Sequence, residues 1–358
     1  MSDDEADPEL MELLRQHLQG RLVIQEDADT GVLSDAEYVY NQGTDVAIDM
    51  MRTKEAAEII WAGMQAKSYS PATWSEYPLH PKLKDETTVA FIFTMDLLNF
   101  CFWSELPEDE RFAVEYEGKR WTGYASLVAS LQRALQDGVP ITDPAFWKDE
   151  EKCDLDALQQ VFRSCTEEDM PLLQERLNCL RQASKVLDEK YEGSILNLVE
   201  AADKSAPRLV NLLAEDFECF RDEHPFEGRN KPIRILKRAQ ILVADLWACF
   251  EGKSFGEFRD IDSITIFADY RVPQILSTLG ALWVGPKIAA AVRDKKILES
   301  GTCSIWCVEL LKREIKRAHP EAHVNAVLID FYLYDTMKQM EAEGNEPIPH
   351  HRTRSIWY

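Results

Sequence analysis

Hydrophobic positions recur three and four residues apart over most of this chain, the spacing of one face of an α-helix. The pattern begins near residue 37, and strands do not alternate with helices along it. Helices are predicted over 46–64, 87–103, 124–135, 155–162, 170–187, 195–202, 207–217, 233–250, 287–300, 304–318 and 325–343. The segment 114–121 instead combines β-forming residues with a Glu-Gly turn and predicts one small β-hairpin. We therefore expect a single, mainly α-helical domain over residues 36–358.

Residues 1–35 follow this pattern least. They are rich in acidic side chains and include Gly20 and Gly31, so we expect an acidic, mobile N-terminal extension. The start of the chain is unlike a basic secretory or mitochondrial leader. No apolar run reaches the ~20 residues of a membrane span, so no membrane partner is expected.

The composition is typical of a folded intracellular protein. Hydrophobic residues make up 45% of the 358 positions and aromatic residues 10%, which is enough for a sizeable core. Eight cysteines are spread along the chain without a Cys-x-x-Cys pair, a pattern typical of reduced thiols. We expect a cytoplasmic location, with the nucleus as the alternative.

Charge narrows the class of ligand. The 40 basic and 63 acidic side chains give a net charge of −23, and so acidic a surface repels a phosphate backbone. Stable nucleic-acid binding is therefore not expected. A small anionic ligand stays compatible with this charge, because one pocket can be locally basic.

The stretch 264–276 carries the strongest candidate for chemistry. It opens apolar, sets Asp269, Tyr270 and Arg271 side by side, and continues into a helical pattern at Pro273. Proline suits the first turn of a helix. Asp269 is thus expected just outside a helix N-terminus, where the dipole favours an ionised carboxylate. On these residues alone, an acidic residue with a purely structural role is the alternative.

A second candidate lies in the predicted helix 87–103. Asp96, Asn99 and Trp103 stand at i, i+3 and i+7 and are therefore expected on one helix face. Burying a carboxyl and an amide unpaired costs about 1–3 kcal/mol each, so these groups need partners. They either tie neighbouring helix ends together or form a pocket wall in which Trp103 stacks on a planar ligand.

Two later helices also place polar residues in apolar stretches. Lys237 and Gln240 lie three positions apart and are expected to face one cleft, where the lysine can hold a phosphate. Ordinary solvated side chains are the alternative. Asp330 and Tyr334 lie four positions apart in an aromatic run, where a carboxyl needs a partner or a cleft.

The segment 350–358 is basic and aromatic. Because a flexible tail rarely ends in Ile-Trp-Tyr, we expect these last side chains to be packed. Arg352 and Arg354 are candidates for contact with an anion, with a salt bridge as the alternative.

Signatures of other chemistries do not occur in the sequence. Gly-x-Gly-x-x-Gly, the P-loop, Gly-x-Ser-x-Gly and His-Glu-x-x-His are absent. His319 and His323 have the spacing of metal ligands, but Pro320 interrupts the helix between them and no third ligand is suggested. Cys303 and Cys307 lack a histidine partner and are interpreted as core residues. Neither a metal nor a cofactor is expected.

The remaining candidates suit hydrolysis of an N-glycosidic bond. Such a bond breaks through an oxocarbenium-like state, which a carboxylate stabilises while it orients or deprotonates water. Aromatic and amide groups hold the departing base, and a basic cluster holds a 5′-phosphate.

Five separated segments also carry a resemblance to a known family. They are Asp-Leu-Leu-Asn-Phe-Cys-Phe-Trp (96–103), Gly-Tyr-Ala-Ser-Leu-Val-Ala-Ser-Leu (123–131), Lys-Arg-Ala-Gln-Ile-Leu-Val-Ala-Asp-Leu-Trp (237–247), Phe-Ala-Asp-Tyr-Arg-Val-Pro-Gln (267–274) and Ile-Asp-Phe-Tyr-Leu-Tyr (329–334). In this order they look like motifs of the queuosine salvage proteins, which are queuosine 5′-phosphate N-glycosylases. The resemblance covers about residues 37–358.

The resemblance implies a helical fold similar to that of helix-hairpin-helix DNA glycosylases, acting on a free nucleotide. It implies release of queuine from queuosine 5′-monophosphate, so that the base can be reinserted into tRNA. Asp269 would be the catalytic carboxylate. The substrate-binding residues would be Asp96, Asn99, Trp103, Lys237, Tyr270, Asp330 and Tyr334.

Within this set, Asp96, Asn99 and Trp103 would belong to the base pocket, and Lys237 would contact phosphate or ribose. A 7-deazaguanine base lacks N7, so its departure needs an acid acting elsewhere on the ring. Asp96 and Asp330 are the candidates for that acid.

Two other functions stay open on the residues alone. A non-enzymatic α-helical adaptor with an acidic binding surface would show an exposed apolar groove and no enclosed site around Asp269, Asp96 and Lys237. A nucleic-acid base glycosylase would show a basic stripe, against which the net charge of −23 argues.

Overall fold

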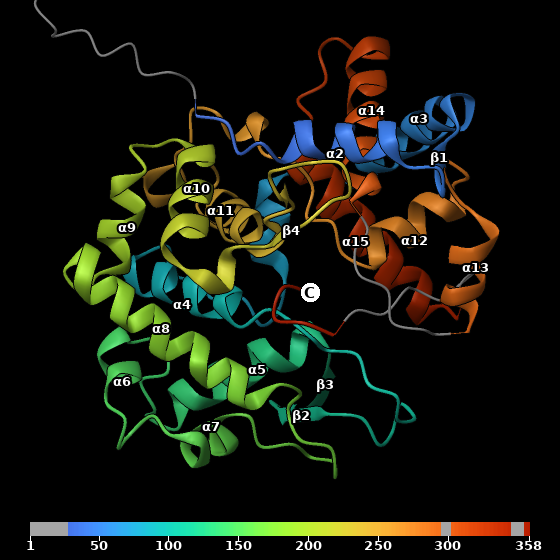
Figure 1. Ribbon diagram of the computed structural model, residues 1–358. Coiled ribbons are helices and arrows are strands. Elements are labelled where there is room, and N and C mark those ends of the chain that lie inside the picture. The colour runs from blue at the N-terminus through green and yellow to red at the C-terminus, as the bar shows by residue number, and fades with distance from the viewer. Residues whose placement is uncertain (1–27, 295–301, 345–353) are drawn as a thin grey trace, which may run out of the picture.

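The computed structural model describes residues 28–294, 302–344 and 354–358. The prediction of a mainly α-helical protein is confirmed (Figure 1). The helices are α2 (Val32–Gln42), α3 (Met50–Ala66), α4 (Glu86–Leu97), α5 (Tyr124–Gln136), α6 (Pro144–Lys148), α7 (Leu155–Val161), α8 (Leu173–Tyr191), α9 (Ile195–Ala201), α10 (Ala206–Asp216), α11 (Lys237–Cys249), α12 (Arg271–Thr278), α13 (Pro286–Arg293), α14 (Cys303–Ala318) and α15 (Ala326–Ala342). Short 3-10 helices lie at η1 (Pro71–Glu76), η2 (Glu218–Phe220), η3 (Ser254–Gly256) and η4 (Ile261–Ser263).

The predicted hairpin is present as strands β2 (Ala113–Tyr116) and β3 (Lys119–Thr122), which pair antiparallel. Its turn residues Glu117 and Gly118 have φ of 52° and 70°, the left-handed values that a two-residue hairpin turn with the right twist requires. One hairpin was expected, but the described residues form two further antiparallel pairs. These are β1 (Val46–Ile48) with β6 (Leu282–Val284), and β4 (Glu223–His224) with β5 (Ile233–Arg234). Strands of two or three residues are too short to produce an alternating pattern.

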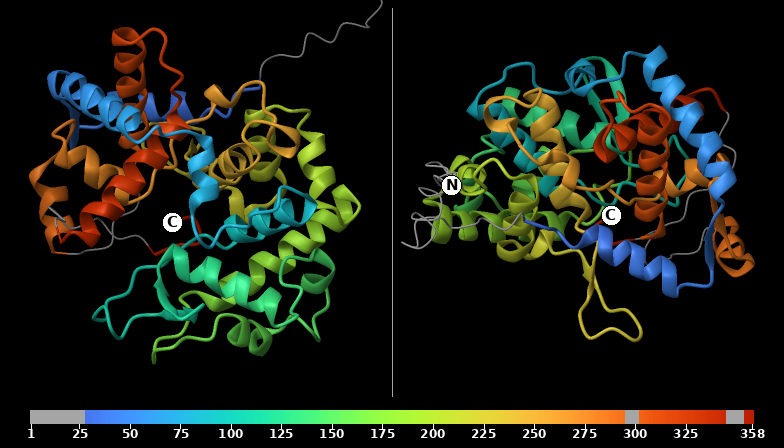
Figure 2. Two further views of the ribbon diagram at one scale, coloured as in Figure 1. Left: turned by 180° about the vertical axis from the view of Figure 1, so that it is seen from behind. Right: turned by 90° about the horizontal axis from the view of Figure 1, so that it is seen from above.

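Helix α4 packs against α5, α9 and α11, and all its residues from Phe91 to Leu97 are buried. It belongs to one of two groups of helices, which runs from α4 to α11, and the other group comprises α2, α3 and α12 to α15 (Figure 1). Figure 2 shows from two further directions that residue 358 lies between these groups.

The predicted helix 87–103 ends earlier than expected, at Leu97. Two buried arginines bind the carbonyl oxygens that the next turn would have used. Arg238 donates to the carbonyls of Asp96 at 3.1 Å and of Leu97 at 2.5 Å, and Arg176 donates to those of Leu98 and, at 2.6 Å, of Phe100. The last carbonyls of a helix need such partners, and guanidinium groups supply several donors from one side chain.

The predicted N-terminal extension, 1–35, falls mainly on residues 1–27, which lie outside the described part of the chain. Residues 32–35 of that segment form the first turn of α2, which packs on α14. Val32 is buried, and the Asp35 carboxylate accepts a hydrogen bond from the Arg234 backbone N–H at 2.9 Å. None of the described helices is long and apolar enough to cross a membrane.

Candidate active site

The segment 264–270 is fixed between two helices. Thr265 donates its backbone N–H at 2.8 Å to the side-chain oxygen of Gln240 on α11. Phe267 donates its backbone N–H at 3.0 Å to the buried carboxyl of Asp330 on α15. The predicted pairing of Gln240 with Lys237 in one cleft is therefore wrong, because the buried Gln240 amide is occupied by backbone groups, including the carbonyl of Ile235 at 3.1 Å.

Asp269 lies at the start of α12, as predicted. Its Oδ1 accepts hydrogen bonds from the backbone N–H groups of Arg271 at 2.7 Å and Val272 at 3.1 Å. These groups belong to the first turn of the helix, which has no internal acceptor for them. Only Oδ1 carries these bonds, so the carboxylate is oriented by the helix while Oδ2 takes no part in the cap.

Arg271 has a structural role beside this carboxylate. Its guanidinium donates to Glu341 at 2.9 Å and to Gln274 at 3.3 Å, and it lies 5.5 Å from the centre of the Tyr270 ring. The ion pair ties α12 to α15. Burial raises the pKa of Tyr270 to about 12, so its hydroxyl is a neutral donor at physiological pH.

Lys237 is the first residue of α11 and is 7% exposed. Asp222 shapes the turn before it, because its carbonyl accepts from Ile235 at 3.0 Å and its carboxylate accepts from the Lys237 backbone N–H at 3.4 Å. Burial lowers the pKa of the Lys237 ammonium. The charge of Asp269, and to a smaller extent that of Asp330, raises it again. Among the described residues, this ammonium has no hydrogen-bonding partner.

Asp330 lies near enough to Lys237 and Asp269 for their charges to act on one another. Burial, followed by the charge of Asp269, raises the pKa of the Asp330 carboxyl well above its ordinary range. Tyr334 is one turn further along α15, and burial also raises the pKa of its hydroxyl, with Tyr270 and Asp269 as the next causes. The predicted residues of 264–276, α11 and α15 are thus brought together.

Asp96 and Asn99 are close to one another, although not on one helix face. The Asn99 amide donates to Asp96 Oδ1 at 3.3 Å. Asn99 and Trp103 both lie beyond the end of α4, so the prediction that all three residues share a helix face is wrong. Burial and, next, the charge of Asp245 raise the pKa of Asp96 well above its ordinary range.

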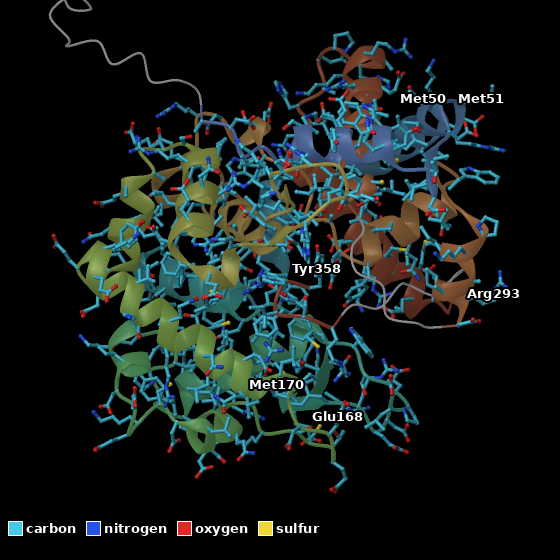
Figure 3. All side chains as sticks on the ribbon, viewed as in Figure 1. Met50, Met51, Glu168, Met170, Arg293 and Tyr358 are labelled. Atoms are coloured by element: carbon cyan, nitrogen blue, oxygen red, sulfur yellow. The ribbon has the colours of Figure 1, made fainter. Side chains whose placement is uncertain are left out.

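Trp103 is covered by the last described segment of the chain. The Arg354 guanidinium lies 4.6 Å from the centre of its ring, a cation–π contact. The Tyr358 carbonyl accepts the backbone N–H of Cys101 at 2.5 Å, and the Lys237 ammonium lies 5.8 Å from the Tyr358 ring. Tyr358 is buried, which confirms that the tail is packed (Figure 3).

Sequence reasoning missed several neighbours of this site. Asp245 on α11 is buried, and burial raises its pKa to about 8. It stands in an apolar helix, the same signal that marked Asp96 and Asp330. Tyr124 is linked to the group through charge, since its pKa is raised by burial and then by Asp245 and Asp96. Its hydroxyl lies 2.7 Å from His80 Nε2. No local sequence pattern predicts a place near the site for either residue.

The arrangement joins carboxyl groups, one buried ammonium and several aromatic rings without a metal site. Among the described residues, no group of three or more His, Cys, Asp or Glu side chains could hold a metal ion. Two cavities of about 460 and 510 Å³ lie elsewhere, beside Trp147 and beside Leu79. Asp269 thus has as neighbours a second carboxyl group, whose pKa is raised by burial, and a buried ammonium.

Comparison with known proteins identifies the family of this chain. The family model described as queuosine salvage protein matches residues 79–358. Three relatives carry the name queuosine 5′-phosphate N-glycosylase/hydrolase. The Schizosaccharomyces pombe protein is 42% identical over 91% of this chain and 99% of its own, and the Mus musculus protein is 40% identical over 90% and 97%. The Sphaerobacter thermophilus protein is 35% identical over 92% and 98%. The chain belongs to the queuosine salvage protein family.

Proposed function

We propose that this protein hydrolyses the N-glycosidic bond of queuosine 5′-phosphate and releases queuine. One observation carries the proposal. Lys237 at the start of α11, Asp269 at the start of α12 and Asp330 on α15 lie near one another. The names of the relatives supply the substrate. The three side chains supply a carboxylate, a neutral acid and a cation, which are the groups that this reaction requires.

Asp269 is the catalytic carboxylate in this mechanism. Its Oδ1 is held by the two N–H groups of α12, so Oδ2 is presented to the sugar without a change of rotamer. A negative charge there stabilises the oxocarbenium-like state and orients the attacking water. The helix cap thus contributes orientation rather than only stability.

Asp330 is the acid that assists departure of the base. Burial and the charge of Asp269 raise the pKa of this carboxyl well above its ordinary range, which favours the protonated form that an acid catalyst needs. In many active sites two carboxyl groups have different pKa values, so that one acts as the acid and the other as the base. Asp96, the other candidate, has Asp245 rather than Asp269 as its main charged neighbour.

Lys237 binds the 5′-phosphate or the ribose. Its ammonium is buried and has no hydrogen-bonding partner among the described residues. In contrast, Arg238 donates to backbone carbonyl oxygens and Arg271 donates to Glu341. Trp103, Asn99, Tyr270 and Tyr334 then line the base and sugar. A phosphate on Lys237 also offsets the cost of burying the cation.

The test incubates the purified protein with queuosine 5′-monophosphate and follows free queuine by chromatography. We expect queuine and ribose 5-phosphate in equal amounts, with little release from ordinary nucleotides. The absence of queuine release, with queuosine and the ordinary nucleotides also unchanged, would refute the proposal. In that case the α-helical adaptor becomes the leading function, and binding of a basic protein partner the next measurement.

A further inference from the structure

Asp96 and Asp245 form a pair of buried carboxyl groups between α4 and α11. Asp96 is fully buried and Asp245 is 5% exposed. The two helices pack directly against one another. Apart from burial, Asp245 has the largest effect in raising the pKa of Asp96, so the two carboxyls are close neighbours. The mechanism above uses neither oxygen of Asp245.

One oxygen of this pair lacks a partner. Asp96 Oδ2 is buried and accepts no hydrogen bond within the described residues. The side chain of Trp74 faces Asp245 instead, and its hydrogen bond to that carboxyl partly opposes the rise of the Asp245 pKa. Buried polar atoms are satisfied in more than nine cases of ten, so the exception at Asp96 needs an explanation.

The pair also lacks a cation of its own. The nearest guanidinium, Arg238, donates to the carbonyls of Asp96, Leu97 and Cys219. Lys237 has Asp269 as its main charged neighbour. The pair also affects the pKa of Tyr124 and, through Asp245, those of Asp330 and Cys249. Neither cation near the pair is therefore held by it, since Arg238 is bound to backbone carbonyls and Lys237 lies closer in charge to Asp269.

We infer that Asp96 and Asp245 bind a cationic group of the substrate, the secondary ammonium in the side arm of the queuine base. This inference rests on the proposed function. A secondary ammonium has two N–H donors, one for each carboxyl group, and its single charge offsets one ionised carboxylate in a buried place while the other carboxyl stays protonated. A nucleotide without this cation would leave the two buried carboxyl groups without a hydrogen-bond donor. Its affinity would fall far more than the loss of an apolar contact would cause.

Binding measurements test the pair separately from catalysis. Queuine and its neutral-arm analogue, 7-cyano-7-deazaguanine, are titrated into the wild-type protein by calorimetry, and into the variants Asp245→Asn and Asp188→Asn. Asp188 is an exposed carboxylate paired with Lys148 and serves as the matched control. We expect Asp245→Asn to weaken the binding of queuine by roughly 100-fold and the binding of the analogue by less than about 3-fold. Asp188→Asn should change the affinity for neither compound.

Two results overturn the inference. Equal losses for both compounds mean that the pair reads the ring edge of the base instead of its arm. Equal binding of the two compounds by the wild type excludes recognition of the cation, even if Asp245→Asn does not fold. A wild type that binds queuine selectively but releases none from the nucleotide refutes the proposed function while leaving the pair intact.

Discussion

Asp269 makes two contributions that one substitution can separate. Asparagine caps helices as well as aspartate does, so Asp269→Asn keeps the bonds to Arg271 and Val272 but removes the charge. We expect kcat for queuine release to fall roughly 10²–10⁴-fold. The melting temperature should stay within a few degrees of the wild type.

The matched control for that variant is Asp262→Asn, because Asp262 is an exposed carboxylate whose ion pair with Lys316 is 3.5 Å long. Its kcat should equal that of the wild type. Near-normal turnover by Asp269→Asn would remove Asp269 from the catalytic role.

Lys237 should distinguish a nucleotide from a nucleoside. Lys237→Met keeps the apolar stem next to the Tyr358 ring and removes the ammonium. If the ammonium binds phosphate, kcat/KM for queuosine 5′-monophosphate should fall by roughly 100-fold and that for queuosine by less than about 3-fold. Steady-state kinetics with both substrates measure the ratio, and an equal loss on both would move Lys237 from the phosphate to the ribose or the base.

His80 gives the folded state a dependence on acid. Its Nδ1–H donates to the Trp74 carbonyl at 2.9 Å, and its Nε2 lies 2.7 Å from the Tyr124 hydroxyl. Burial lowers the pKa of the ring to about 4, so the ring is neutral near pH 7. A histidine with an unfolded pKa of 6.5 contributes this stability fully above that pH. It loses the stability as the pH falls toward 4, by at most about 1.4 kcal/mol per unit.

Asp245, with its pKa raised to about 8, acts in the opposite direction, since it loses stability as pH rises. The comparison of wild type with His80→Gln therefore isolates the histidine. Urea unfolding at several pH values between 4.5 and 7.5 should show a shallower acid slope for the variant. Identical slopes would mean that the His80 ring has the same pKa in the folded protein as in the unfolded chain.

At the scale of elements, Gly63 sets how closely α3 and α15 approach. A Cβ added at Gly63 would lie 1.9 Å from the hydroxyl oxygen of Tyr332. Tyr332 is buried and has little room to move, because its ring packs edge-on against Tyr69 at 5.6 Å. Helix propensity alone would make Gly63→Ala stabilising by about 0.5–1 kcal/mol, but overpacking should make it destabilising by about 1–3 kcal/mol.

The sign of the change in unfolding free energy decides between these effects. Denaturant unfolding should show the loss for Gly63→Ala and a partial recovery when Tyr332→Phe is added, since the closest atom is then gone. A stabilised single variant would mean that the two helices separate without cost.

How well each element could be predicted depends on whether its cause is local. Asp96 and Asp330 could be found from sequence, because a carboxyl in an apolar helix needs a partner wherever it lies. The end of α4 could not be found, because Arg176 and Arg238 act from segments far along the chain. The same reason explains the unpredicted pairing of β1 with β6.

At the scale of the whole molecule, the segment 354–358 lies between the two groups of helices and packs on the group that runs from α4 to α11 (Figure 2). The Tyr358 carbonyl binds the Cys101 N–H, Arg354 lies over Trp103, and Trp357 packs edge-on against His224 at 5.6 Å. His224 in turn lies 2.8 Å from the carboxylate of Asp222, which shapes the turn before Lys237. The segment thus contacts both the base side and the phosphate side of the proposed site.

Removal of residues 354–358 should therefore impair substrate binding more than folding. We expect KM for queuosine 5′-monophosphate to rise at least about 10-fold, because Trp103 and Lys237 lose the groups that cover them, while the far-ultraviolet circular dichroism stays helical. Ser355→Ala is the control, since it removes one hydroxyl that accepts the Trp357 N–H at 3.1 Å and keeps the three tertiary contacts. If the shortened protein kept the wild-type KM, the segment 354–358 would take no part in substrate binding.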